Sequence, residues 1–345
     1  MQTGPPLKIC VVLPAKNEGR VIARTLASLR KAAIPADDIY VIDDGSTDDT
    51  GAIAKSFGCR VMRNEVNIGK AKGVEKITKD FHLLERYDVI AMMDADTVVN
   101  PSYYYAVRKS FQDPEVNVVC GRPKSAPYNH LTAWRAMGYF MTHFIYRGGQ
   151  SNMGVINVAP GCASSYRTHV FAQLDWNKDT LVEDMDVTIQ IHRKHLGKIV
   201  YQPEANVITQ DPRTLRDYYK QMDRWHTGTW QVSRKHHMIK GMQRVDWEFK
   251  LLMGEGLILS LFILFFPIGL CIWPKLFLQG AAIDAGILFL VSVICGLVDR
   301  RWDVIYYFPV YEFMRFVDAL VFFRSFWKIT VQKREAHSWF SVQRY

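Results

Sequence analysis

The amino-acid sequence predicts an α/β protein with a membrane region towards its C-terminal end. Over the first two hundred residues, short apolar runs alternate with helical patterns, which is typical of a parallel sheet with helices on its faces. Residues 251–298, in contrast, contain only three charged side chains, Glu255, Lys275 and Asp284. The rest of the 345-residue chain has the charge content of an ordinary soluble domain. A water-soluble part is therefore joined to a membrane part.

The elements of the soluble part follow one another in a regular order. Four apolar runs are predicted as strands, and the helical patterns fill the intervals between them. The predicted strands are Lys8–Leu13, Ile39–Ile42, Arg60–Arg63 and Val89–Met93, and the predicted helices are Gly19–Lys31, Asp48–Phe57 and Lys70–Phe81.

Two of the predicted strands lead directly into carboxylates. Asp43 and Asp44 end one strand, and Asp94 and Asp96 follow another in an Asp-x-Asp pattern. In open α/β sheets, ligands bind outside the carboxyl ends of the strands. The sequence therefore predicts a ligand site at this edge of the sheet.

Two amphipathic helices, over 130–147 and 213–240, are predicted after the sheet. In the first, Leu131, Trp134, Gly138, Met141 and Ile145 share one stripe. Residues 213–250 hold nine basic and four acidic side chains. Such helices are either ordinary core helices or helices that lie on an anionic membrane surface, and the apolar segment that follows favours the membrane surface.

Two membrane spans are predicted, at about 254–273 and 280–298, each long enough for a hydrocarbon core of about 30 Å. Basic residues flank the pair, including Arg300 and Arg301, so the positive-inside rule places residues 274–279 outside and the soluble domain in the cytosol. The apolar run near the N-terminus, Ile9–Leu13, is too short for a signal peptide, in agreement with a multi-pass protein of the cell membrane whose soluble domain is cytosolic.

A third apolar helix is predicted over 304–323, with Glu312, Arg315 and Asp318 on one face. This helix either lies in the membrane interface or buries that face against a partner, and the basic residues after it disfavour a third full span.

Charge and cysteine content exclude two classes of protein. The net charge of +9 is concentrated beside the apolar spans, which argues against nucleic-acid binding. The six cysteines form no C-x-x-C pair, so a disulfide framework is not expected, and reduced thiols fit a cytosolic protein.

Two further motifs complete an ordered series of functional residues. Glu183 and Asp184 open a helical segment, and Gln221-x-x-Arg224-Trp225 follows in the second amphipathic helix. Each motif alone is common, whereas four in this order, two of them at strand ends, are not expected by chance.

With these motifs, residues 8–235 resemble the family 2 glycosyltransferases. The Gln-x-x-Arg-Trp segment is similar to that of the membrane-embedded branch, which includes cellulose, chitin and hyaluronan synthases. The resemblance implies a Rossmann-like GT-A domain that binds a nucleotide sugar, commonly linked to UDP, and an inverting transfer to a carbohydrate or lipid-linked acceptor.

The resemblance also implies roles for individual residues. Asp184 matches the family's general base, with Asp186 as the other candidate, and Asp96 matches a direct ligand of Mg²⁺ or Mn²⁺, with Asp94 on the ribose or a metal-bound water. Val182 departs from the family's Thr before the acid pair. Residues matched to donor binding are Pro14, Glu18, Asp43, Asp44, Lys70, Asp94, Gln221 and Arg224. Residues matched to the acceptor side are Gly161, Glu183 and Trp225.

The expected organisation is a catalytic GT-A domain at 1–212, an interface and acceptor region at 213–250, and a membrane region at 251–345. The expected function is transfer of a sugar from a UDP-sugar to a growing polysaccharide or glycolipid at the lipid bilayer. Two alternatives stay open: single-sugar transfer to a polyprenyl phosphate, and a nucleotide-sugar-binding scaffold without catalysis. Two spans are few for a polymer channel, so further helices would have to come from the 304–323 segment or from a homo-oligomer.

Overall fold

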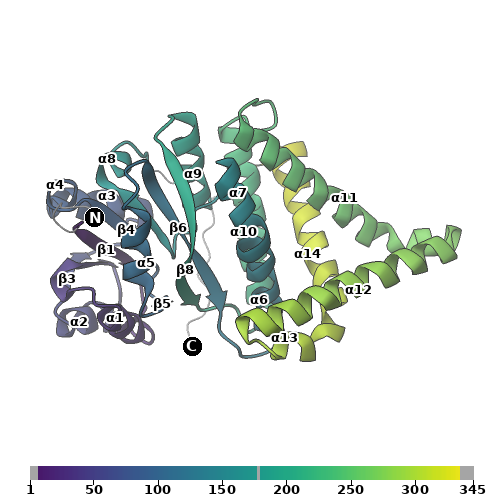
Figure 1. Ribbon diagram of the computed structural model, residues 1–345, viewed down its shortest axis with the longest axis horizontal. Helices are drawn as coiled ribbons and strands as arrows, with labels where there is room; N and C mark the ends of the chain where they lie inside the picture. Colours follow the sequence, from purple (N-terminus) through teal and green to yellow (C-terminus); the bar gives the residue numbers. More distant parts are fainter. Residues whose placement is uncertain (1–6, 177–178, 335–345) are drawn as a thin grey trace.

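The computed structural model describes residues 7–176 and 179–334, and these form a sheet with helices on both faces and a bundle of long helices beside it (Figure 1). Within this part of the chain, the sheet has the strand order β3-β2-β1-β4-β7-β6-β8-β5. β1 pairs in parallel with β2 and β4, whereas β7 runs antiparallel to both of its neighbours. The strands are β1 (Ile9–Ala15), β2 (Ile39–Asp44), β3 (Arg60–Asn64), β4 (Val89–Met92), β5 (Val98–Val99), β6 (Val116–Ser125), β7 (Ser164–Arg167) and β8 (Lys198–Thr209).

The core of this domain has two layers because successive side chains of a strand point to opposite faces of the sheet. On β1, Val11 and Leu13 pack on one face, and Cys10 and Val12 pack on the other. An apolar strand that is buried on both faces explains why β1 has no polar alternation. The helices around the sheet are α1 (Ile22–Lys31), α2 (Thr50–Ser56), α3 (Lys70–Asp80), α4 (Leu83–Arg86), α5 (Tyr103–Ser110), α8 (Thr168–Phe171) and α9 (Glu183–Arg193), with a short 3₁₀ turn η1 (Ala36–Asp38).

The first of the two predicted amphipathic segments is not a single regular helix. It consists of α6 (His130–Tyr139), a π-helix η2 (Phe140–Tyr146) and α7 (Arg147–Met153). The wider turn of a π-helix breaks the period of 3.6 residues. Accordingly, Leu131 of the predicted stripe is buried, whereas Ile145, within the π-helix, is exposed. Gly138 is exposed as well, although it precedes the π-helix. The second segment is one helix, α10 (Leu215–Lys235), which ends five residues before the predicted boundary at 240.

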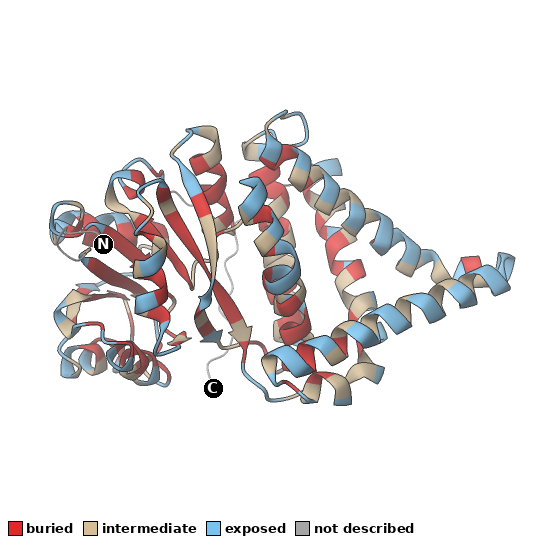
Figure 2. Cartoon of the chain, in the orientation of Figure 1, coloured by how far each residue is buried: buried red, intermediate tan, exposed pale blue. Residues whose placement is uncertain are grey.

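Two long helices, α11 (Arg244–Ile272) and α12 (Pro274–Asp299), contain the two predicted spans and are long and apolar enough to cross a membrane. They project from the rest of the molecule, and most of their surface is exposed (Figures 1 and 2). In the apolar 18-residue stretch of each helix, only 11% and 17% of the stretch is buried. The two helices therefore differ from the core helices of a soluble protein.

The end of α12 is fastened to the sheet by ion pairs. The Asp299 carboxylate accepts hydrogen bonds from Arg122 and Lys124 of β6, each at 2.8 Å. Arg301, two residues after Asp299, donates a hydrogen bond to the backbone carbonyl of Ser125 at the end of the same strand. The base of the α11–α12 hairpin is therefore held against β6 of the sheet.

The predicted third apolar helix is shorter than expected and begins later, as α14 (Tyr311–Phe326). It packs against α10 and α11. Of its predicted polar face, Arg315 and Asp318 contact other parts of the chain, whereas the Glu312 side chain is mostly exposed. Arg315 is paired with Asp284 of α12, and Asp318 accepts hydrogen bonds from Trp134 and Tyr218 at 2.8 and 2.7 Å. The remaining short turns are α13 (Asp303–Tyr306), η3 (Phe308–Val310) and the π-helical η4 (Trp327–Val331).

Candidate active site

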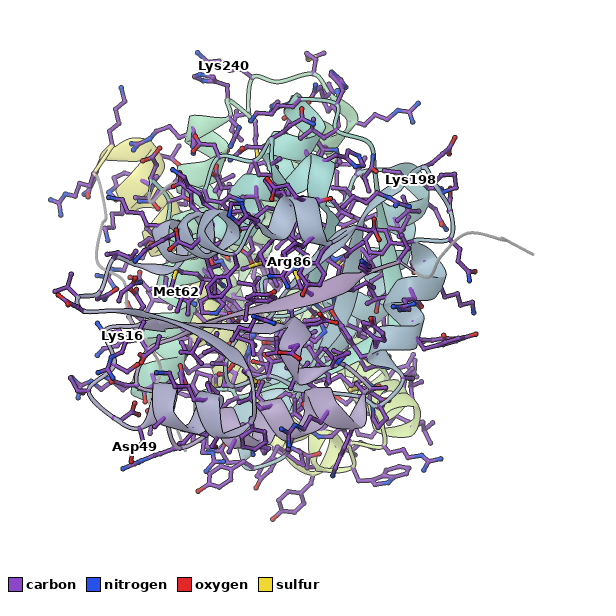
Figure 3. The ribbon with its side chains drawn as sticks, turned by 90° about the vertical axis from the view of Figure 1, so that its left-hand side faces the viewer. Lys16, Asp49, Met62, Arg86, Lys198 and Lys240 are labelled. Carbon is purple, nitrogen blue, oxygen red and sulfur yellow. The ribbon has the colours of Figure 1, made fainter. Side chains whose placement is uncertain are left out.

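The carboxyl ends of β1, β2 and β4 meet at one edge of the sheet. In Figure 3, Lys16, which follows the end of β1, lies on the opposite side of the molecule from Lys198, which begins β8. A cavity of about 1840 Å³ runs from the Lys16 edge to the walls of α11, α12 and α14. Its position agrees with the rule that ligands bind beyond the carboxyl ends of parallel strands.

Almost all the residues predicted for the site line this one cavity, although they come from seven separate segments of the chain. The exception is Asp43, which is not part of the wall. The residues in the wall are Pro14, Glu18, Asp44, Lys70, Asp94, Asp96, Gly161, Glu183, Asp184, Gln221, Arg224 and Trp225.

Asp43 and Asp44 differ because neighbouring residues of a strand face opposite sides of the sheet. The buried Asp43 carboxylate accepts a hydrogen bond from the backbone N–H of Ser46 and lies so close to Gly51 of α2 that a side chain there would collide with it. Asp44 faces the cavity, so the nucleotide role implied for both acids has direct geometric support only at Asp44.

Asp44 orders the loop that leads into α3. Its carboxylate accepts hydrogen bonds from the backbone N–H groups of Ile68 and Gly69 at 2.9 and 2.7 Å, and from the Asn64 side chain at 3.0 Å. Gly69 has a φ of +87°, a conformation that favours glycine, and the next residue is Lys70. The end of β2 therefore fixes the position at which Lys70 enters the cavity.

Lys70 joins three parts of the site. Its ammonium group lies 3.0 Å from Asp94 Oδ1, in the loop after β4, and 2.7 Å from Glu183 Oε1, at the start of α9. Burial alone would lower the pKa of Lys70, but the two carboxylates outweigh it and raise the pKa well above its ordinary value. Lys70 is therefore a permanent cation at the centre of the site.

Glu183 and Asp184 are adjacent, yet their surroundings drive their pKa values in opposite directions. Burial and the Glu183 charge raise the pKa of Asp184, although N–H groups of Gly161 and Met185 donate to its carboxylate at 3.2 and 2.8 Å. Burial would also raise the pKa of Glu183, but Lys70 outweighs burial and lowers it. Paired carboxylates with diverging pKa values are a pattern of acid–base catalysis, and the raised pKa of Asp184 is compatible with the base role that the sequence predicts.

Asp186, the other candidate base, does not line the cavity. It is buried, and its carboxylate contacts Lys235 at 2.9 Å and His236 at 2.7 Å, both near the end of α10. Burial would raise the pKa of Asp186, but hydrogen bonds from these two partners lower it instead. Asp186 therefore connects α9 to α10.

Asp94 and Asp96 are the candidate metal ligands. Both line the cavity in the loop after β4, and Asp96 is only 4% exposed. Among the described residues, no three His, Cys, Asp or Glu side chains form a metal-binding group. Mg²⁺ and similar hard cations are commonly held by one or two carboxylates together with substrate phosphates, so the two acids fit such an ion.

The Gln221, Arg224 and Trp225 side chains come from one helix, α10. The guanidinium of Arg135, on α6, lies 4.5 Å from the centre of the Trp225 ring and so covers one of its faces. Arg135 is in turn paired with Asp211 at 3.2 Å. The α10 motif and α6 therefore form a continuous wall of the cavity.

Part of the cavity wall has no counterpart among the predicted residues. Arg135, His143 and Arg147 line it from the α6–η2–α7 segment, and apolar side chains of α11 and α12 such as Leu259 and Leu288 line it from the membrane region. The sequence pattern indicated only an amphipathic helix over 130–147, because the buried charges belong to no recognisable motif.

The family model for glycosyl transferase family 2 matches residues 10–175, which include β1, the two acid pairs, Lys70 and Gly161. The chain carries a family 2 glycosyltransferase domain. Poly-beta-1,6-N-acetyl-D-glucosamine synthase of Staphylococcus epidermidis is 26% identical over 231 residues, 65% of this chain and 55% of that protein. The probable glycosyltransferase YdaM of Bacillus subtilis is 29% identical over 241 residues, 66% of this chain and 56% of that protein. The chain thus spans little more than half the length of these relatives.

The structure of mannosyltransferase PcManGT from Pyrobaculum calidifontis in complex with GDP-Man and Mn²⁺ is similar in fold. The TM-score is 0.58, and the match covers 94% of this chain and 88% of the other at 14% identity. The family 2 domain therefore has the α/β, GT-A-like fold implied by the resemblance, followed by C-terminal helices.

Proposed function

We propose that the protein is a membrane-associated inverting glycosyltransferase that takes a sugar from a UDP-sugar and adds it to a growing polysaccharide or glycolipid. The observation that carries this proposal is one cavity that contains the Lys70–Asp94–Glu183 cluster, the Asp184 carboxylate and walls from the apolar helices. A nucleotide, a sugar and an amphiphilic or polymeric acceptor would therefore share one space.

The donor half of the site is assigned to the carboxyl edge of the sheet. Glu18 and Asp44 would contact the nucleoside, with Pro14 shaping the turn after β1. Lys70 and Arg224 supply cations for a diphosphate, and Gln221 lies one helical turn before Arg224. Asp43 supports the same edge through Ser46.

A divalent cation would be held by Asp96 and Asp94 and would neutralise the charge that develops on the departing diphosphate. The structure of the similarly folded mannosyltransferase in complex with GDP-Man and Mn²⁺ supports a divalent cation in such a site.

Asp184 is proposed as the general base. The acceptor hydroxyl attacks the anomeric carbon, its proton passes to Asp184, and the bond from the sugar to the diphosphate breaks with release of a nucleoside diphosphate. Gly161 leaves room for the sugar, because an added Cβ would lie 3.1 Å from Lys70 Nζ and 3.7 Å from Asp184 Cβ. Glu183 and Trp225 would border the acceptor.

The names of the relatives support a polymeric product. Several are poly-beta-1,6-N-acetyl-D-glucosamine synthases. Transfer of a single sugar to a polyprenyl phosphate is the second candidate, favoured by the apolar walls of the cavity. We place the family 2 domain in the cytosol at the membrane, with α11 and α12 crossing it, on the strength of the flanking basic residues.

Sugar transfer to defined products tests the proposal. The purified full chain in detergent is incubated with one radiolabelled UDP-sugar at a time, with Mg²⁺ or Mn²⁺, and the products are sized. A ladder or a high polymer is expected for a polysaccharide synthase, and one labelled lipid for single transfer. Binding of UDP without transfer or hydrolysis of any donor would instead support the non-catalytic scaffold.

A further inference from the structure

The α6–η2–α7 segment places three buried nitrogen-bearing side chains in the cavity wall. Arg135, His143 and Arg147 are 7%, 4% and 4% exposed. Within the described residues, Arg135 Nη2, His143 Nδ1 and Arg147 Nε make no hydrogen bond. Buried polar groups are normally hydrogen-bonded, and all three side chains line the cavity, so this part of the wall has unused hydrogen-bonding capacity next to the space for a ligand.

Arg147 differs from the other buried arginines of this region. Arg122 is paired with Asp299, and Arg135 with Asp211, whereas Arg147 forms no ion pair within the part of the chain that the structure describes. Its partners are amide oxygens, Gln150 Oε1 at 2.8 Å and Asn157 Oδ1 at 3.4 Å. A buried charge without a counter-ion is costly, so an anion in the cavity would complete this site.

The local conformation and the neighbouring histidine favour an external anion. His143 lies in the middle of a π-helix, a conformation that is frequent at functional sites. Burial, together with the positive charges of Arg147, Arg122 and Arg135, holds its pKa well below the ordinary value, so His143 is neutral and can donate a hydrogen bond without adding charge.

The surroundings indicate what kind of molecule carries the anion. The same cavity continues along apolar side chains of α11, α12 and α14, including Leu259, Leu288 and Phe322. We propose that Arg147, with His143 and Arg135, binds the phosphate group of a lipid-linked acceptor, whose hydrocarbon part lies along these helices. This inference rests on the proposed glycosyltransferase function and names its acceptor class.

A phosphate could also come from the nucleotide donor, and a binding experiment separates the two sources. Isothermal titration calorimetry of the full chain in a non-ionic detergent uses three probes: farnesyl phosphate, farnesol and UDP. Farnesyl phosphate is expected to bind at least about tenfold more tightly than farnesol, since a hydrogen-bonded ion pair is formed only with the phosphate.

Arg147→Gln is expected to weaken farnesyl phosphate binding at least about tenfold and to leave the UDP dissociation constant within about twofold. Arg147→Lys should restore part of the loss. Arg244→Gln, which removes an exposed charge at the start of α11, is the matched control and should bind all three probes like the parent chain.

Equal binding of farnesyl phosphate and farnesol, or undiminished binding by Arg147→Gln, would overturn the proposal. An equal loss of UDP binding would assign Arg147 to the donor diphosphate and would overturn it as well. Absence of sugar transfer by a chain that still shows Arg147-dependent binding would refute the proposed function and leave the phosphate site standing.

Discussion

At the scale of single residues, the two neighbours Glu183 and Asp184 show how one helix start can supply two different carboxylates. Lys70 lies 2.7 Å from Glu183 and keeps it ionised, whereas the Asp184 carboxylate faces Gly161 with only backbone N–H donors. The charge on Glu183 itself helps to raise the pKa of Asp184. A carboxylate that is harder to ionise is a stronger base at neutral pH.

Asp184→Asn is expected to lower the turnover of sugar transfer by about 10²- to 10⁴-fold, because the amide cannot accept the acceptor proton. UDP binding should persist. In the parent chain, turnover should rise with pH through the raised pKa of Asp184, so the acid limb of the pH–rate profile lies above the ordinary Asp value of about 3.9.

The melting temperature of the Asp184→Asn variant is the control that separates loss of catalysis from loss of the fold. Because its pKa is raised in the folded state, ionised Asp184 destabilises the fold at neutral pH, and Asn should not lower the melting temperature. Near-normal turnover of Asp184→Asn together with an inactive but folded Asp186→Asn would move the base to Asp186.

Asp96→Asn is expected to weaken the metal-dependent part of UDP binding and to abolish transfer, because it removes a hard oxygen ligand. UDP affinity is measured with Mn²⁺ and with EDTA. Asp80→Asn, an exposed acid at the end of α3, should behave like the parent chain. UDP affinity that is insensitive both to EDTA and to Asp96→Asn would refute the metal assignment.

At the scale of elements, α9 carries Asp184 into the cavity and is held in place by Asp186. The Asp186 carboxylate contacts Lys235 and His236 of the α10 end, and apolar side chains of both helices pack in the same cluster, among them Ile189 and Trp230. The helix that presents the candidate base and the helix that carries the Gln-x-x-Arg-Trp motif are therefore joined at one point.

Asp186→Asn is expected to lower the free energy of unfolding by roughly 2 to 4 kcal/mol at neutral pH, because it leaves a largely buried ion pair incomplete. The folded-state pKa of Asp186 is lowered, so its stabilising effect is present above the unfolded value of about 3.9 and is lost as the pH falls below it. Melting temperatures of the two proteins should converge in acid.

Asp179→Asn provides the matched control. Asp179 also faces Lys235, at 3.7 Å, but its side chain is 66% exposed, so its loss should change stability by less than about 1 kcal/mol. Equal effects of the two substitutions would show that the buried ion pair does not join α9 to α10.

The sequence predicted the first elements well and the later ones poorly, for physical reasons. Three of the four predicted strands, β1, β2 and β4, are buried on both faces, and all four alternate with helical patterns, so local pattern suffices. β6, β7 and β8 pair through contacts between distant segments, and β8 includes Pro203 and Glu204, which a local pattern does not assign to a strand.

The site was predictable to the extent that its residues belong to motifs. Carboxylates at strand ends and the α10 motif all point to one cavity, because topology brings strand ends together. The motif predicts nucleotide binding for both Asp43 and Asp44. Neighbouring side chains of a strand point to opposite faces of the sheet, however, and only Asp44 faces the cavity. Arg147 could not be found, because its significance comes from a missing counter-ion, which only the three-dimensional structure reveals.

At the scale of the whole molecule, the apolar hairpin of α11 and α12 is attached to the sheet through Asp299 and Arg301 (Figure 1). The helical bundle and the sheet thus share walls of one cavity. The orientation of this assembly in the membrane remains a prediction from the basic residues that flank the hairpin.

A cysteine at Lys275 is expected to react with a membrane-impermeant maleimide added outside intact cells, and one at Lys333 is not, because the flanking basic residues stay in the cytosol. Both are made in a Cys271→Ser background, because Cys271 is exposed near the same end of α11. Labelling of Lys333→Cys from outside would mean that α14 crosses the bilayer, and absence of labelling at Lys275→Cys in cells, with labelling after lysis, would invert the orientation.

If the acceptor is lipid-linked, as we propose, the shared cavity also determines which concentration controls the rate. A donor dissolved in water diffuses to the sheet edge in three dimensions. An acceptor dissolved in the bilayer diffuses in the two dimensions of the membrane and enters the cavity along α11, α12 and α14. For such an acceptor the relevant quantity is its mole fraction among the surrounding lipids. Neutral lipid or detergent added at constant total acceptor should therefore slow transfer by surface dilution, while the dependence of the rate on the donor stays unchanged.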